Sequence, residues 1–308
     1  MSDIKLFKLH GQLAKELPGK ASDLEKPLQT LIEMNLEELL GVRFLVSEHS
    51  TGKTHGGKID SLGIDEDNCP VILEYKRSVS ENVINQGLFY LDWLMDHKAE
   101  FELLVLKKCG QKVADKIDWS APRLICIASD FTKYDGHAVQ QMHRSIELIR
   151  YKQFGADLLL LELVRSSIGS VSSSKPQNTA KKPPALAKNG TTGDKTAAQW
   201  FATMTPEHKA LFESLEGYLF ALGDDVQRKD LKLYVAFKRI KNFACVGFKK
   251  DALFVWLKVD PTIVQLEEGF TRDVRQIGHW GTGDLELLLR GHDDLEKAKP
   301  LIQKAYDG

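Results

Sequence analysis

The sequence lacks any arrangement of cysteines that would form a disulfide framework or bind a metal ion. Its four cysteines stand far apart, without a CxxC spacing, so we expect reduced thiols that pack in the interior. The nine histidines are equally scattered and show no spacing typical of a zinc site. These absences argue against zinc-finger, iron–sulfur and disulfide-scaffold proteins.

Long hydrophobic runs are absent as well. No apolar stretch approaches the roughly 20 residues that a membrane-spanning helix needs, and the N-terminal segment MSDIKLFKLHGQ has no hydrophobic core of a signal peptide. We therefore expect a cytoplasmic protein with no membrane partner. The net charge of -1 gives no overall sign of a polyanionic partner, although a nearly neutral total can conceal local patches.

The chain is long enough for two globular domains. It has 308 residues, of which 43% are hydrophobic and 28% charged, as in an ordinary globular protein. A stretch dominated by Ser, Pro, Gly, Lys, Ala and Thr has no aromatic residues and no periodicity, so it cannot offset its ordering entropy by burial. We predict an N-terminal domain over residues 1–165, a flexible linker over 166–198 and a C-terminal domain over 199–308.

The pattern of the N-terminal domain predicts helices alternating with strands. The expected order is a helix over Pro27–Leu40, the strands VRFLVSE, GKIDSLGI and VILEYKR, a helix from Asn82, the strand RLICIAS, a helix over His137–Tyr151 and a final strand over Asp157–Val164. This order indicates an α/β fold with a mixed sheet flanked by helices.

The polar turn DEDNC sets the register of the second and third strands. If the turn centres on Asp67, residues whose numbers sum to 134 oppose each other, which places Asp60 opposite Glu74. Directly opposed residues have Cβ atoms roughly 5 Å apart, and like charges so placed destabilise the sheet unless something compensates. Strand alternation puts Lys76 on the face of Glu74 and Tyr75 on the other face.

Two carboxylates and an ammonium group on one patch suit metal-assisted phosphodiester hydrolysis. Carboxylate oxygens favour Mg²⁺ or Mn²⁺, such a cation activates water, and a lysine can stabilise the developing charge. The alternative is a surface salt bridge between Glu74 and Lys76, with Asp60 solvated. From these three residues alone, both interpretations stay open.

The spacing of these residues resembles a known nuclease family. Asp60 after Ile59, followed by EYK at residues 74–76, is similar to the PD-(D/E)xK nuclease superfamily, and most to the RecB-like branch that includes the NucS-type endonuclease catalytic domain. The resemblance implies a restriction-endonuclease-like αβββαβ core. It further implies that Asp60 and Glu74 bind the metal, that the Tyr75 carbonyl is a further ligand and that Lys76 is the catalytic lysine.

A second motif strengthens the resemblance. Gln86 and Tyr90 in NQGLFY match the QxxxY motif of the RecB-like branch, and an i, i+4 pair shares one helix face. Two features depart from or extend the pattern. Ile59 stands where the family's proline would be. Many members also contribute an acidic residue from the first helix, and Glu33 is the candidate for it. The alternative is that Glu33 lies on the solvated surface of the helix.

The segment from Ser50 to Gly57 superficially resembles a nucleotide-binding loop. GKT ends the Walker A pattern, but Ser47 occupies the position of its first glycine and a strand-like run follows, which argues against an NTPase. We instead predict a polar, flexible loop. The residues that we expect to contact nucleic-acid phosphates, in this loop and beside the two strands, are Lys53, His55, Lys58 and Arg77.

The C-terminal domain is predicted to be a smaller α+β domain. It should contain a helix capped by Thr205, several strands, and a closing helix over Asp293–Tyr306. Between Arg228 and Lys258, nine basic residues alternate with aromatic residues, which suggests either nucleic-acid contact or strands with one buried aromatic face. This half resembles uncharacterised domains appended to such nuclease-like modules.

Together these observations favour a metal-dependent DNA endonuclease whose C-terminal domain selects the substrate or a partner. RNA is the alternative substrate, and a homodimer would supply two sites for cutting two strands. Two other hypotheses stay open. One is a noncatalytic nucleic-acid-binding protein on a nuclease fold, and the other is an interaction or transport-associated scaffold protein.

Overall fold

The computed structural model describes residues 4–20, 25–76, 82–167 and 195–308. Two compact units make up the chain, one formed chiefly by Met1–Gly169 and the other by Ser170–Lys238 and Phe243–Gly308. The linker predicted over 166–198 lies mostly outside the described residues. At its ends, Ser166 and Ser167 belong to a strand and Ala197 begins a helix.

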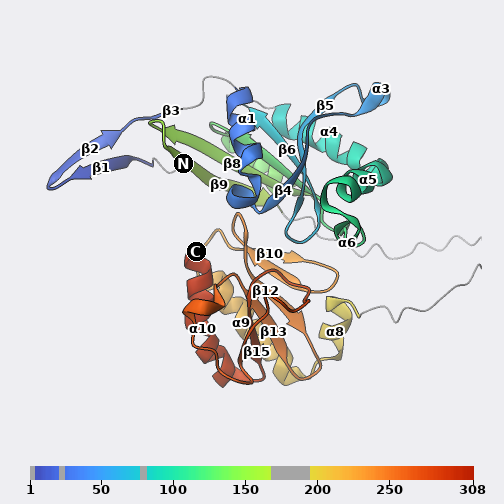
Figure 1. The fold of residues 1–308 in the computed structure, drawn as a ribbon, viewed down its shortest axis with the longest axis vertical. Helices are drawn as coiled ribbons and strands as arrows, with labels where there is room; N and C mark the ends of the chain where they lie inside the picture. Colours follow the sequence, from blue (N-terminus) through green and yellow to red (C-terminus); the bar gives the residue numbers. More distant parts are fainter. Residues whose placement is uncertain (1–3, 21–24, 77–81, 168–194) are drawn as a thin grey trace, which may run out of the picture. The chain divides into compact units, whose positions relative to one another are not determined.

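The first unit begins with an antiparallel hairpin and continues as an α/β domain (Figure 1). Its strands are β1 (Leu6–His10), β2 (Leu13–Leu17), β3 (Gly19–Lys20), β4 (Val42–Ser50), β5 (Lys58–Asp65), β6 (Pro70–Lys76), β7 (Arg123–Ala128), β8 (Ser145–Phe154) and β9 (Leu158–Ser167). Its helices are α1 (Glu25–Met34), α2 (Leu36–Leu40), α3 (Gly52–His55), α4 (Asn82–Asp96), α5 (Lys98–Cys109), α6 (Gln111–Ala114) and α7 (Lys133–Gln140).

The main sheet of this unit is mixed, as predicted. Its seven strands include the path β3-β8-β7-β6-β5-β4, with β9 paired to β8. The pairs β4–β5 and β5–β6 are antiparallel, whereas β6–β7 and β7–β8 are parallel. The helices α1 and α2, three strands, the helices α4 to α6 and strand β7 follow one another in chain order. This order confirms the predicted αβββαβ core.

Helices cover both faces of this sheet. On one face, Leu28, Ile32 and Leu36 from α1 and α2 pack against Leu73 and other residues of the sheet. On the other, α4 and α5 contribute a second buried cluster that includes Leu91, Trp93, Leu94, Phe101 and Val105. Because both faces are buried, the central strands β6 and β7 are nearly continuous apolar runs, VILEY and RLICIA. A charged residue in such a strand is therefore exceptional.

The hairpin between β5 and β6 has the predicted register. Ser61 pairs with Leu73, Leu62 with Ile72 and Ile64 with Pro70. Its tight turn is fixed by the Asp65 carboxylate, whose Oδ1 accepts hydrogen bonds from the backbone N–H groups of Asp67 (3.0 Å) and Cys69 (2.8 Å). Asn68 takes a left-handed conformation, with φ of 62°, which asparagine tolerates better than most residues.

The helix predicted over His137–Tyr151 is wrong in its second half. A capping box between Thr132 and Asp135 starts α7 earlier, and the helix ends at Gln140. Ser145–Phe154 is strand β8, which pairs with both β7 and β9. The sequence SIELIRYKQF has apolar residues at spacings that suit a helix or a strand, so tertiary pairing decides its state. The exposed hairpin β1–β2 was also missed, since it presents no alternation of buried and solvated residues.

The second unit is an α+β domain, in agreement with the prediction. Its strands form a six-stranded sheet in the order β10-β11-β12-β13-β15-β14. The strands are β10 (Gln227–Asp230), β11 (Val235–Lys238), β12 (Asn242–Phe248), β13 (Leu253–Leu257), β14 (Thr271–Asp273) and β15 (Leu285–Leu289). The helices are α8 (Ala197–Thr203), α9 (Pro206–Ala221) and α10 (His292–Asp307), with a short 3-10 turn η1 (Pro261–Ile263).

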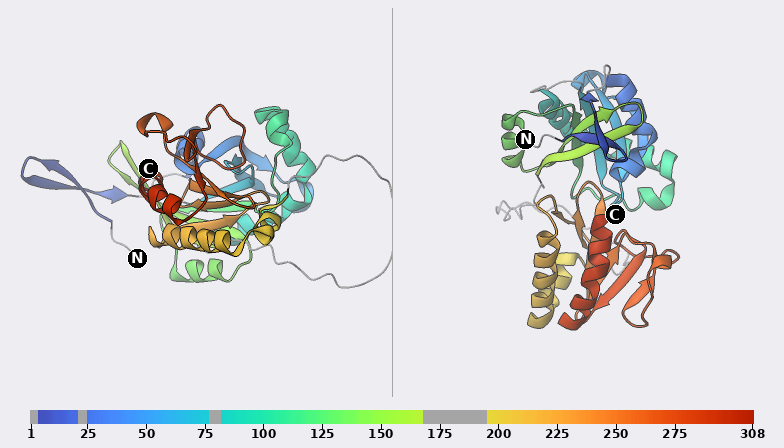
Figure 2. Two further views of the ribbon diagram at one scale, coloured as in Figure 1. Left: turned by 90° about the horizontal axis from the view of Figure 1, so that it is seen from below. Right: turned by 90° about the vertical axis from the view of Figure 1, so that its left-hand side faces the viewer.

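Helices α9 and α10 lie on the same face of this sheet (Figure 2). Their apolar residues, among them Leu215 and Ile302, pack against alternate residues of the strands. The Thr205 side chain accepts a hydrogen bond from His208 N, so it caps α9 as predicted. No helix in the described part of the chain combines the length and the apolar character needed to cross a membrane.

A buried ion network joins three strands at one end of the first unit's sheet. Arg123 at the start of β7 donates to Asp65 Oδ2 (3.0 Å) and forms two hydrogen bonds to the Glu147 carboxylate (2.8 and 2.9 Å). All three side chains are at most 5% exposed. Both carboxylates raise the pKa of the arginine against the opposing effect of burial. The network links the β5–β6 turn to strands β7 and β8.

Replacing Arg123 with alanine should lower the free energy of unfolding by about 3 to 5 kcal/mol, because two carboxylates would stay buried without their cation. Urea denaturation of the two proteins measures this difference. Arg144→Ala is the matched control, since Arg144 pairs with Asp92 in the solvent and its loss should cost about 1 kcal/mol or less. Equal effects of the two substitutions would contradict this account of the network.

Candidate functional site

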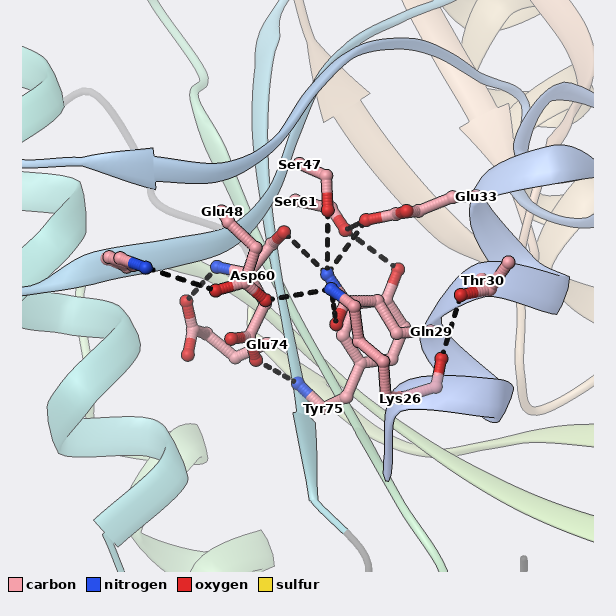
Figure 3. A network of polar contacts seen from close by, with 11 residues as sticks. Lys26, Gln29, Thr30, Glu33, Ser47, Glu48, Asp60, Ser61, Glu74 and Tyr75 are labelled. Carbon is pink, nitrogen blue, oxygen red and sulfur yellow. Dashed lines mark hydrogen bonds and ion pairs between the residues drawn. The ribbon is translucent and has the colours of Figure 1, made fainter. Parts of the chain in front are cut away.

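Asp60 and Glu74 are neighbours on adjacent strands, as the register requires. Glu74 Oε1 accepts a hydrogen bond from the backbone N–H of Asp60 (3.2 Å), and Asp60 Oδ2 accepts one from the backbone N–H of Tyr75 (3.0 Å) (Figure 3). Each carboxylate thus binds the backbone of the opposite strand. These reciprocal hydrogen bonds fix both side chains beside each other.

Glu74 is fully buried and lacks a complete set of partners. Its side chain lies in the middle of the sheet, beside the buried Cys126 of β7. Among the described residues, no hydrogen-bond donor contacts Glu74 Oε2. Burial and the nearby charge of Asp60 raise the pKa of Glu74 to about 9. A buried carboxyl oxygen without a donor is costly, so this position needs either a proton or a cation.

Asp60 is less deeply buried, and its environment is similar. Burial raises its pKa, while the backbone N–H of Tyr75 and the charge of Lys76 act in the opposite direction. Lys76 is the last residue of β6 and is half-buried. Its positive charge also opposes the upward shift in the pKa of Glu74. The three groups of the predicted patch therefore interact electrostatically.

Tyr75 points away from this patch, as strand alternation predicts. Its side chain is buried in the cluster beneath α1, and the Ser61 hydroxyl donates to the Tyr75 hydroxyl (3.2 Å). Burial raises the pKa of the tyrosine. Any contribution of Tyr75 to a metal site must therefore come from its main chain.

Helix α1 contacts the Asp60 strand through a residue that was not predicted to take part. Gln29 is buried, and its Nε2 donates to the Asp60 carbonyl oxygen (2.8 Å), to Glu33 Oε1 (2.8 Å) and to Ser47 Oγ (3.1 Å) (Figure 3). A glutamine between Leu28 and Ile32 on an apolar helix face was the available signal. Gln29 holds the Asp60 main chain in place.

Glu33, the predicted first-helix ligand, has other partners. Its Oε1 accepts hydrogen bonds from Ser61 Oγ (2.6 Å) and from Gln29. Ser61 lies on the face opposite to that of Asp60, and no contact among the described residues joins the Glu33 carboxylate to Asp60 or Glu74. A ligand role for Glu33 stays a prediction.

Glu48, on the neighbouring strand β4, adds a third carboxylate close to Asp60. The β4–β5 register, in which Ser47 pairs with Ser61 and His49 with Ile59, sets Glu48 beside Asp60. Its negative charge contributes to the raised pKa of Asp60, although Lys26 binds its Oε1 at 2.9 Å. The φ of Glu48 is 53°, a conformation that costs about 1 kcal/mol or more for a non-glycine residue.

Gln86 and Tyr90 lie together on α4, as the QxxxY spacing predicts. Gln86 Nε2 donates to the Tyr90 hydroxyl (3.3 Å). The ring of Tyr90 packs on Gly57, where a Cβ atom would lie only 2.6 Å from the Tyr90 hydroxyl oxygen. Gly57 is three residues before Asp60, so this contact connects α4 to the strand of the first carboxylate.

The segment from Ser50 to Gly57 contains a short helix, α3, where a flexible loop was predicted. The Thr51 hydroxyl joins the two ends of this segment, because it donates to the Gly57 carbonyl and accepts from the Gly57 N–H, each at 3.0 Å. Lys53 and Lys58 are exposed, and His55 packs against Phe89 with ring centroids 5.1 Å apart. Arg77, the fourth predicted phosphate contact, lies outside the described residues.

The side chains of the patch determine which metal ions it can bind. Within the ranges that the structure describes, no group of three or more His, Cys, Asp or Glu side chains could hold a metal ion. Asp60 and Glu74 supply two carboxylates. Mg²⁺ typically binds one or two protein carboxylates and completes its coordination with water and substrate phosphate. Among the described residues Glu74 Oε2 has no hydrogen-bond partner, so this oxygen and the neighbouring Asp60 carboxylate are oxygen donors of the kind that a divalent cation binds.

Replacing Glu74 with glutamine should stabilise the protein in the absence of metal. Between its ordinary pKa and about 9, the folded protein keeps the Glu74 proton while the unfolded chain has lost it. Stability therefore falls as the pH rises through this window. At about pH 8, Glu74→Gln should raise the free energy of unfolding by about 1 to 3 kcal/mol, as measured by urea denaturation in EDTA.

The difference should shrink near pH 5, where Glu74 is neutral in both states. Glu102→Gln, an exposed substitution on α5, is the control and should leave stability nearly unchanged at both pH values. If Glu74→Gln were less stable than the original protein at pH 8, the assignment of a strained carboxyl group would be wrong.

The chain is similar to several known proteins. Residues 197–308 match a family described as a domain of unknown function, DUF5655. Over 299 residues the chain is 29% identical to an uncharacterized protein of Haemophilus influenzae, and the alignment covers 96% of each protein.

Two solved structures are similar to part of the chain. One is a repair endonuclease from Pyrococcus abyssi, with 20% identity and a TM-score of 0.29, covering 42% of this chain and 48% of that one. The other is an EndoMS–dsDNA2 complex, with 20% identity and a TM-score of 0.28, covering 42% of this chain and 47% of that one. The chain thus matches about half the length of each solved chain.

Proposed function

We propose that this protein is a metal-dependent DNA endonuclease with its catalytic centre at Asp60, Glu74 and Lys76. The observation that carries the proposal is the buried Glu74 carboxyl group, which faces Asp60 and has one oxygen without a donor among the described residues. A structural ion pair would satisfy both oxygens. A site that must accept a cation, and then a substrate, leaves one carboxylate oxygen available.

Asp60 and Glu74 would hold Mg²⁺ or Mn²⁺, with the main-chain carbonyl of Tyr75 as a further ligand. Both cations prefer oxygen donors, and both carboxylates are already oriented by backbone N–H groups. When bound, the cation lowers the pKa of an attacking water and neutralises negative charge on the scissile phosphate. Its binding would also displace the proton that burial now favours on Glu74.

Lys76 would supply a positive charge on the substrate side of the pair. It is half-buried at the end of β6, and strand alternation places it on the same face as Glu74. An ammonium group at this position can stabilise the negative charge that develops on the phosphate oxygens, or it can orient the attacking water. Partial burial strengthens either effect, because water screens the charge less.

Gln86 and Tyr90 would act as positioning residues. Their mutual hydrogen bond and the packing of Tyr90 on Gly57 connect α4 to the start of β5. The exposed Lys53 and Lys58 flank this contact in the sequence, and we assign them, with His55 and Arg77, to contacts with the DNA backbone. Such contacts set affinity and register without reading sequence.

Cleavage of supercoiled plasmid, single-stranded and branched DNA in Mg²⁺ or Mn²⁺ tests the proposal. Cleavage should require the metal, and Lys76→Ala should reduce its rate by about 10²- to 10³-fold, the usual effect of removing one charge-stabilising group. Glu74→Ala should abolish it. Lys107→Ala, an exposed lysine of α5 purified in parallel, should cleave at the original rate.

Three outcomes would overturn the proposal. Cleavage that persists in EDTA, or that is equal in Lys76→Ala and Lys107→Ala, would indicate a contaminating nuclease. If no substrate is cut but DNA is bound with a steep salt dependence, the protein is a noncatalytic nucleic-acid-binding protein.

A further inference from the structure

The second unit contains a cavity on the sheet face that α9 and α10 leave open. Its volume is about 750 Å³, within the range of about 300 to 1,000 Å³ that is usual for ligand pockets. Aromatic rings and two basic residues line much of it: Trp200, Phe254, Trp256, Trp280, Lys249 and Arg272. This cavity belongs to a different unit from the carboxylate pair.

Strand alternation explains why aromatic rings line this face. In β13, Leu253, Val255 and Leu257 point into the core beneath the helices, so Phe254 and Trp256 point to the opposite face. Their rings are nearly parallel, with an interplanar angle of 12° and centroids 6.0 Å apart. These two rings form an aromatic wall of the cavity, in which Phe254 is half-buried and Trp256 is buried.

Trp256 is held rigidly in this wall. It is only 4% exposed, and its ring lies against Gly247 of β12 and Gly281, where a Cβ atom would lie 2.6 and 2.5 Å from ring carbons. Its Nε1 donates to Glu286 Oε2 (2.9 Å). Two glycines and a buried carboxylate thus fix this indole in place.

The loop between β14 and β15 places Trp280 at the rim. His279 anchors this loop, since its ring stacks on Trp256 with a 23° interplanar angle and its two nitrogens lie 2.8 and 3.0 Å from the carbonyl oxygens of Ile277 and Gly283. Gly283 has φ of 124°, and any side chain there would meet the Leu257 main chain. Trp280 itself is 42% exposed, which is unusual for a tryptophan.

Two cationic side chains stand beside the aromatic wall. Lys249 Nζ lies 4.4 Å from the ring centroid of Phe254. Arg272 is 56% exposed and also donates to Glu286 Oε1 (2.7 Å). Because Arg272 binds Glu286, it neutralises the buried carboxylate and offers its outer edge to the solvent. Glu268 and Glu286 also line the cavity, so Lys249 and the solvent-facing edge of Arg272 are the groups that the anionic part of a flat ligand would meet.

We propose that this cavity binds an unpaired nucleobase of single-stranded DNA. The base would stack against the exposed Trp280, beside the half-buried Phe254, and the adjoining phosphates would meet Lys249 and Arg272. Nucleotides combine a flat aromatic group with an anionic one, which matches the cavity, and stacking of a base on an aromatic ring tolerates any sequence. This binding requires no metal and goes beyond the catalytic role proposed for the first unit.

Calorimetric titration of the full chain with an oligothymidylate of about 12 nucleotides, in EDTA, tests the proposal. Trp280→Ala should weaken binding by about 5- to 150-fold, the usual effect of losing one stacked base, and Trp280→Phe should retain most of the affinity. Phe220→Ala is the control, because Phe220 is also exposed (43%) but lies on α9, outside the cavity.

An abasic strand of the same length separates stacking from phosphate contacts. It should bind the original protein as weakly as oligothymidylate binds Trp280→Ala. The proposal is overturned if the abasic strand binds as tightly as oligothymidylate, or if Trp280→Ala and Phe220→Ala have equal affinities. Because no cleavage is measured, these results are independent of whether the first unit is a nuclease.

Discussion

The register of the β5–β6 hairpin is the constraint on which the rest of the site depends. Asp65 sets this register with one carboxylate oxygen, which holds the turn, while its other oxygen binds Arg123 in the buried ion network. A shift by one residue would place Asp60 and Glu74 on opposite faces of the sheet. The turn and the ion network therefore determine that Asp60 and Glu74, several residues away, lie beside each other.

Burial raises the pKa of both carboxyl groups of the pair and makes the pair costly to stability. Glu74 occupies a strand that is otherwise apolar, where one of its oxygens has no donor in the described part of the chain. Functional centres often retain such unsatisfied groups at the expense of stability. Glu48 adds a second cost in stability, because its left-handed backbone beside Asp60 is strained.

The sequence was most informative where local rules decide the structure. Turn chemistry and strand alternation correctly predicted that Asp60 and Glu74 are neighbours and that Tyr75 points to the opposite face of the sheet, because both depend on a few neighbouring residues. Contacts between distant segments were missed. Gln29 reaches Asp60 across 31 positions, and Trp280 joins a cavity whose other walls come from different strands. Strand β8 was mistaken for a helix, since its pairing partners rather than its own pattern determine it.

A titration with Mn²⁺ followed by electron paramagnetic resonance tests the central claim most directly, because free Mn²⁺ loses its signal intensity when a protein binds it. We expect one bound ion per chain in the original protein, a loss of that binding in Asp60→Asn, and unchanged binding in Asp92→Asn, since Asp92 is an exposed residue of α4. Equal binding by all three proteins, or none by the original protein, would contradict the assignment of the buried pair as a metal centre.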